Sequence, residues 1–100
     1  MTQTKKELHL DWRYPFMVES NGVGGYLATC RDVPEAITEA SSREELETMA
    51  EDALVTAIDF YREDQRPLAR PSAPQAGDLV VSLPESMRNM VVQLTSKGER

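Results

Sequence analysis

Residues 26–61 most constrain the fold, because two short strand-like segments are followed at once by one long amphipathic helix. The apolar segments Tyr26–Cys30 and Ala36–Ala40 are separated by a turn that contains Pro34. Strands joined so closely pair antiparallel, and the helix that follows them has to bury its apolar stripe against their sheet. The stretch therefore predicts an α+β domain with a helix across one face of an antiparallel sheet.

The helix is expected to begin after Ser42 and to run to about Arg62. Ser42 fits the N-cap position, and Glu45 three residues later completes the S-x-x-E pattern of a capping box. Apolar residues then recur at helical spacing. They are Leu46, Met49, Ala50, Ala53, Leu54, Ala57 and Tyr61. We expect this stripe to face the core.

Two further strands complete the predicted sheet. Leu8–Glu19 alternates with a period of two, which is typical of a half-buried strand. Pro15 within it predicts an edge strand or a bulge, because proline cannot donate a ladder hydrogen bond. A glycine-containing turn at 20–25 leads into the second strand, so the first three strands form a meander. The short apolar run Asp78–Leu83 is expected to be the fourth strand.

A short C-terminal helix is expected after Pro84, which suits the first turn of a helix. Its apolar stripe consists of Met87, Met90, Val91 and Leu94. The stripe either packs within the monomer or forms a contact between copies, and both interpretations stay open. The predicted order is βββαβα in a single domain of residues 1–100, with a loose tail at 1–7 and a proline-rich loop at 64–77.

Charge and composition limit the classes of function. The formal net charge of −6 argues against nucleic-acid binding by the chain and favours a basic protein partner. Cys30 is the only cysteine and lies in an apolar run, so we expect a buried side chain. The N-terminus lacks the apolar segment of a signal peptide, and no apolar run approaches the ~20 residues of a membrane span. We therefore expect a cytoplasmic protein.

No catalytic, metal-binding or cofactor-binding pattern is present. His9 is the only histidine and has no set of ligands beside it. Ser41 and Ser42 have no base nearby, and the glycines at 22–25 precede a strand rather than a helix, which is the wrong context for a phosphate-binding loop. We expect a protein that binds another protein, is not an enzyme, and uses no cofactor or metal.

Several short motifs occur in a familiar order. They are R-Y-P at 13–15, G-G-Y at 24–26, D-V-P-E-A-I-T at 32–38, A-x-x-A-L-x-x-A-I-D-F-Y at 50–61, the segment Pro67–Ser72 within the proline-rich loop, and V-x-L-P at 81–84. This succession, which covers about residues 12–94, resembles the N-terminal domain of HicB-type antitoxins. The resemblance implies a partial ribonuclease H-like fold. It also implies an antitoxin that binds a small basic HicA-like mRNA endoribonuclease and sterically blocks it.

The resemblance, together with the acidic face of the long helix, suggests which residues contact the toxin. The candidates are Gly24, Gly25, Tyr26, Asp32, Pro34, Glu35, Thr38, Glu47 and Glu51. We expect the turn at 32–35 to lie beside the glycine hairpin and to present its carboxylates rigidly. Ordinary turn chemistry and a solvated helix face are the alternative interpretations of these residues.

Three other expectations concern function. Relatives of this kind often continue into a DNA-binding domain, whereas the sequence stops at Arg100 without a recognition helix, so we expect this chain alone not to bind duplex DNA. A stand-alone HicB-like interaction or dimerisation module without a toxin is the main alternative function. A metal-dependent ribonuclease H-like nuclease is a further one.

Overall fold

The computed structural model describes residues 12–97. Its elements, in chain order, are β1 (Arg13–Ser20), β2 (Tyr26–Cys30), β3 (Ile37–Ala40), α2 (Arg43–Asp64), β4 (Leu79–Ser82), the 3-10 turn η1 (Glu85–Met87) and α3 (Arg88–Lys97). The predicted tail at 1–7 and His9 lie outside the described residues.

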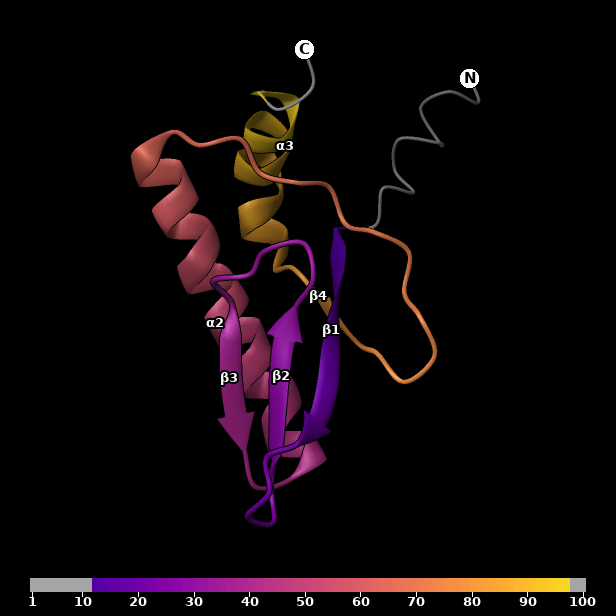
Figure 1. Cartoon of the computed structure of the whole chain (residues 1–100). Coiled ribbons are helices and arrows are strands. Elements are labelled where there is room, and N and C mark those ends of the chain that lie inside the picture. The colour runs from indigo at the N-terminus through magenta and orange to yellow at the C-terminus, as the bar shows by residue number, and fades with distance from the viewer. Residues whose placement is uncertain (1–11, 98–100) are drawn as a thin grey trace.

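The strands form one antiparallel sheet in the order β3-β2-β1-β4. Helix α2 lies behind the sheet and crosses it, while α3 stands beyond the end of β4 (Figure 1). The α+β class and the predicted order of strands and helices are therefore confirmed. The opposite face of the sheet carries no helix in the described part of the chain (Figure 1).

The core lies between the sheet and α2. Tyr14 and Phe16 of β1 are fully buried, and so are Leu54 and Ile58 of α2. The predicted helix stripe is confirmed except at Met49, which remains 38% exposed, and at Ala53, which is half-buried. Met49 lies on the flank of α2 that faces the β3 edge, where no further strand of the described chain extends the sheet over it.

The predicted edge position of Pro15 is wrong. Strand β1 is central, and Pro15 is buried opposite Val80 of β4. The pairing of β1 with β2 begins only at Phe16, so Pro15 lies where one side of β1 has no ladder partner. A residue without an N–H group is tolerated there, because no hydrogen bond to β2 is lost.

Both ends of α2 are capped. The hydroxyl of Ser42 accepts a hydrogen bond from the Glu45 N–H at 3.1 Å, as predicted. The Glu45 carboxylate, however, accepts from the N–H and the hydroxyl of Ser41 rather than from the Ser42 N–H. At the other end Gln65 adopts the left-handed conformation, with φ of 55°, and its N–H donates to the Arg62 carbonyl, which ends the helix.

The β1–β2 hairpin explains two of the glycines. The Asn21 side-chain oxygen accepts hydrogen bonds from the N–H groups of Val23 and Gly25, which folds the connection into a compact turn. A Cβ atom at Gly25 would lie 2.6 Å from the Ala40 carbonyl oxygen. Gly24 has φ of 91°, a conformation that favours glycine. Both glycines are therefore required by the backbone.

The C-terminal helix packs on the same core. Val91 and Leu94 are buried, with 0% and 4% exposure, so the monomer itself covers this part of the apolar stripe. Met87 and Met90 are half-buried against the core. A contact between copies through this stripe stays a prediction, and its half-buried members Met87 and Met90 are the ones left to take part in it. Within residues 12–97, no helix combines the length and apolar character needed to cross a membrane.

Candidate functional site

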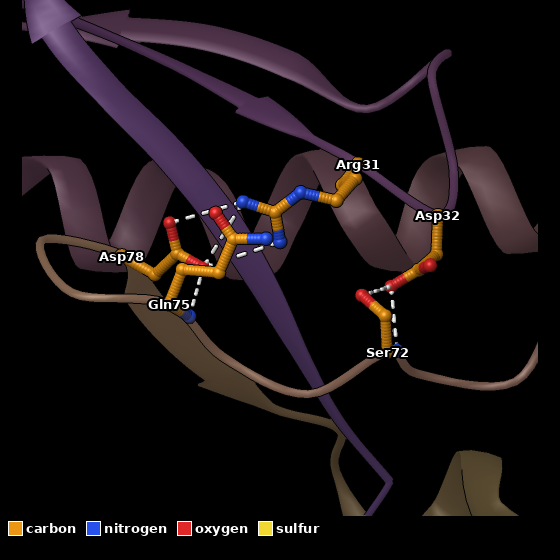
Figure 2. A network of polar contacts seen from close by, with 5 residues as sticks. All are labelled: Arg31, Asp32, Ser72, Gln75 and Asp78. Atoms are coloured by element: carbon orange, nitrogen blue, oxygen red, sulfur yellow. Dashed lines mark hydrogen bonds and ion pairs between the residues drawn. The ribbon is translucent and has the colours of Figure 1, made fainter.

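The turn after β2 holds the α2–β4 loop (residues 65–78) in place. Asp32 accepts hydrogen bonds from the backbone N–H of Ser72 at 2.9 Å and from its hydroxyl at 3.0 Å. Figure 2 shows both contacts, with Arg31 reaching a second point of the same loop. Asp32 therefore caps a backbone N–H group far along the chain rather than one within its own turn.

Arg31 forms the second connection. Its guanidinium donates to both carboxylate oxygens of Asp78, with all three N–O distances at 3.2 Å (Figure 2). The Asp78 side chain is only 6% exposed and also accepts from the Gln75 N–H at 2.8 Å. A bidentate pair with one buried partner fixes orientation as well as distance. The start of β4 is thereby aligned with the end of β2.

A third cluster joins the turn to the end of α2. Glu35 accepts a hydrogen bond from the Tyr61 hydroxyl at 2.8 Å and pairs with the Arg66 guanidinium at 3.2 Å. That guanidinium stacks on the Tyr61 ring, 4.0 Å from its centroid. Burial alone would raise the pKa of Glu35, but the hydrogen bonds from Tyr61 and Arg66 outweigh it and the pKa is lowered. Burial and the hydrogen bond to Glu35 raise the pKa of Tyr61.

These contacts change the interpretation of the predicted toxin-binding turn. Asp32 and Glu35 are both engaged inside the monomer, while Pro34 between them is exposed. The glycine hairpin precedes β2 and the turn follows it, so the two lie at opposite ends of the sheet (Figure 1). The expectation that the turn lies beside Gly24 and Gly25 is therefore wrong.

Glu47 and Glu51, the two helix residues predicted to contact the toxin, are exposed, but they face away from the β3 edge of the sheet. Glu47 and Glu51 lie one turn apart on α2. Successive residues of a helix are rotated by about 100°, so both carboxylates lie roughly opposite Met49. The predicted contact residues thus occupy several separate parts of the surface instead of one continuous patch.

The structure reveals a groove that the sequence did not predict. It lies between the β3 edge and α2 and has a volume of about 470 Å³. Its lining consists of Glu35, Ile37, Thr38, Met49, Asp52, Ala53, Thr56, Ala57 and Phe60. Phe60 is 55% and Met49 38% exposed, so the α2 side of the groove presents apolar surface. Two of the predicted contact residues, Glu35 and Thr38, border it.

A signal for this groove was present in the sequence. Phe60 lies next to Tyr61, but the helical repeat places it in line with Met49 and Ala53, on one flank of the stripe. A large aromatic residue on the flank of an acidic helix has nothing to pack on unless another element or a partner covers it. The contact with β3 could not be deduced from the helix alone.

The described side chains provide no evidence for a reactive cysteine or a metal site. Cys30 is 1% exposed, and burial raises the pKa of its thiol to about 11, so the nucleophilic thiolate is disfavoured. Across residues 12–97, no cluster of three histidine, cysteine or carboxylate side chains is placed to hold a metal ion.

The chain matches a described protein family and several curated proteins. The model of the HicB_like antitoxin of bacterial toxin-antitoxin system matches residues 13–90. Antitoxin HicB 1 and Antitoxin HicB 2 of Photorhabdus laumondii subsp. laumondii are 39% and 42% identical over 84 residues. Antitoxin HicB of Escherichia coli (strain K12) is 36% identical over 84 residues. Each match covers 84% of this chain but only 53%, 58% and 61% of the three relatives, respectively.

Proposed function

This chain belongs to the HicB-like family of antitoxins from bacterial toxin–antitoxin systems, and we propose that it acts as an antitoxin against a small basic HicA-like toxin. The match over residues 13–90 carries the proposal, because it includes the whole sheet and α2. The chain spans little more than half the length of the first relatives, so their full activity enters here only as part of the proposal.

The proposed mechanism is occlusion of the toxin's RNA-binding surface. An enzyme that acts on RNA has to present basic groups to the phosphates. Within 41–66 this chain has eight acidic and three basic residues, a net charge of −5, and most of these acids are exposed on α2. Opposite charges accelerate association and favour the correct partner. An antitoxin bound over the basic surface would then exclude RNA without any catalysis of its own.

The predicted contact residues take different roles in this proposal. Thr38 borders the groove, and the exposed Pro34 directly precedes Glu35 of its lining, so both are assigned to direct contact. Glu47 and Glu51 are assigned to long-range attraction, because they face away from the groove. Tyr26 and the hairpin glycines lie at the other end of β3, where Gly24 and Gly25 line a hollow with Glu39, and they are assigned to contact at that end.

Co-expression tests the proposal. The full chain is produced together with the small basic protein encoded beside its gene, and purification, bacterial growth and RNA cleavage are measured. We expect a stable complex, restored growth and inhibited cleavage. A complex without rescue of growth or inhibition of cleavage would instead favour the stand-alone interaction module. RNA cleavage by the purified chain with Mg²⁺ or Mn²⁺ would favour the nuclease alternative.

A further inference from the structure

Strand β3 has one free edge with hydrogen-bonding groups directed outward. Among residues 12–97 it lies at the end of the sheet and pairs with β2 alone. The Cys30 N–H donates to the Ala36 carbonyl at 3.1 Å, which identifies this pair as hydrogen-bonded. Because hydrogen-bonded pairs alternate in an antiparallel ladder, Thr38 and Ala40 also bond toward β2. The N–H and C=O groups of Ile37 and Glu39 therefore point to the free edge.

The apolar groove runs along this same edge. Ile37 and Thr38 border it on the β3 side, and Met49 and Phe60 border it on the α2 side. The register places the Thr38 side chain on the α2 face of the sheet and the Ile37 side chain on the opposite face. A strand added to β3 would direct alternate side chains toward α2 and away from it. The side chains directed toward α2 would enter the groove. An added strand could therefore pair its backbone with β3 and bury side chains in the groove at the same time, as peptides do when they add a strand to a sheet edge.

The charge of the groove indicates the chemistry of the incoming strand. Its lining contains the carboxylate of Glu35, which is already paired with Arg66, the carboxylate of Asp52, and no basic side chain. Asp52 of the groove and Glu39 at the other end of β3 are exposed, and within residues 12–97 neither is paired with a cation. A second copy of this chain would bring the same acids to the edge and would be repelled. A lysine or arginine, by contrast, can lay its apolar stem on Phe60 and direct its charge to Asp52.

We propose that the toxin docks by adding an extended basic segment to the free edge of β3, with a lysine or arginine side chain in the groove between β3 and α2. This inference rests on the proposed antitoxin function and specifies its binding mode. The backbone groups of Ile37 and Glu39 supply the pairing, and the groove selects a long cationic side chain. An apolar residue of the same strand, pointing away from α2, packs on Ile37.

Amide hydrogen exchange in the unmodified protein gives the first test. Nuclear magnetic resonance is recorded on the full chain, alone and with the small basic protein encoded beside its gene. We expect the amides of Ile37 and Glu39 to exchange rapidly in the free chain and to slow by about tenfold or more in the complex. The amides of Thr38 and Ala40, already bonded to β2, serve as internal controls and are expected to be protected in both states.

Substitutions provide the second test. Glu39→Pro removes an outward N–H without disturbing the bonds to β2, and Glu39→Ala is its matched control for the lost charge. We expect Glu39→Pro and Phe60→Ala each to raise Kd about tenfold or more, and Glu39→Ala to stay within about threefold. Asp52→Lys is expected to speed dissociation more than Glu47→Lys, which makes the same change of charge on a different flank of α2. Circular dichroism and urea midpoints verify that each variant is folded.

The outcomes separate this inference from the antitoxin proposal. If the wild-type chain neutralises the toxin but the Ile37 and Glu39 amides remain unprotected, strand addition is wrong and the antitoxin function stands. The same holds if Glu47→Lys weakens binding more than Asp52→Lys. If these amides are protected in a concentrated solution of the free chain and its measured mass is that of a dimer, a second copy pairs with the free edge of β3. That result would overturn the proposal that the toxin binds there. A wild-type chain that neither binds nor neutralises would reject both proposals.

Discussion

Asp32 binds Ser72 across 40 positions of sequence, accepting one hydrogen bond from its N–H at 2.9 Å and another from its hydroxyl at 3.0 Å. The neighbouring residue, Arg31, pairs with Asp78 near the end of the same loop. Two consecutive side chains therefore determine where the proline-rich connection lies before it enters β4 (Figure 2). The D-V-P-E turn, which the sequence suggested as a toxin contact, has a structural role within the monomer.

Replacement of Asp32 by alanine should destabilise the domain. The change leaves two donors of Ser72 without their charged acceptor, and hydrogen bonds to charged groups contribute about 1.5–3 kcal/mol each at most. Because the site is only partly buried, we expect a loss of about 1–3 kcal/mol in urea unfolding. Ser72→Ala, which removes only the hydroxyl, should cost less. Equal stability of wild type and Asp32→Ala would show that water replaces the carboxylate at no cost.

Loss of the N-cap should weaken α2. Ser42→Ala removes the acceptor of the Glu45 N–H, and such substitutions cost ~1 kcal/mol. Ser41→Ala is the matched control, because it removes only the hydroxyl bond to the Glu45 carboxylate and keeps the backbone bond. Its effect on the urea midpoint should be smaller. A larger effect at Ser41 would mean that the bond made by Glu45, and not the cap itself, stabilises the first turn.

Two residues of α2 should differ sharply in their sensitivity to truncation. Leu54 is fully buried, so Leu54→Ala should cost ~2–5 kcal/mol through lost burial and a residual cavity. Phe60 is 55% exposed at the groove, so Phe60→Ala should alter stability by about 0.5 kcal/mol or less. Thermal or urea unfolding measures both. Comparable losses would mean that Phe60 is covered in solution and that the groove is closed.

Acid should weaken the Glu35–Tyr61–Arg66 cluster. The pKa of Glu35 is below its usual 4.5 in the folded state. The ionised carboxylate therefore stabilises the fold above that value, and the contribution is lost as pH falls below 4.5. Glu35→Gln should show a smaller loss of stability than wild type between about pH 6 and about pH 3. Tyr61→Phe, which removes the donor but keeps the ring, should reduce the loss as well. Parallel profiles for all three proteins would refute the assignment.

Glu47 and Glu51 should influence the rate of association with the partner. They are exposed and face away from the groove, so their charges act at long range and are screened by salt. The double substitution Glu47→Ala and Glu51→Ala should slow association at low salt, leave dissociation unchanged, and lose its effect at high salt. Surface plasmon resonance at two salt concentrations measures this. Faster dissociation would place these residues in the contact surface.

Local patterns were sufficient for the elements but not for their long-range contacts. The spacing of apolar residues predicted α2, and Ser42 marked its start correctly. The position of β1 was predicted wrongly from Pro15. Proline is expected at sheet edges because both sides of a central strand are assumed to be paired along its whole length. Here β2 ends before reaching Pro15, and that difference in strand length is set by tertiary pairing.

The candidate site was predictable only in part. Thr38 and Glu35 were anticipated and do border the groove, whereas Ile37, Met49 and Phe60 were not singled out as its apolar rims. Their proximity depends on how α2 rotates over the sheet, which no periodicity within one element specifies. Arg31 and Asp78 are separated by 47 positions, so no local sequence pattern could predict that they pair.

The position of β1 between β2 and β4 has a consequence for the order of folding. Arg13, near the beginning of the described chain, pairs with Ser82 near its end. Closing so long a loop is slow compared with forming a local meander. During synthesis β1, β2, β3 and α2 can assemble first, while the β4 side of β1 stays open as a temporary edge. That edge is the place where a nascent chain would be captured by a chaperone or by another nascent chain, until β4 is made and occupies it.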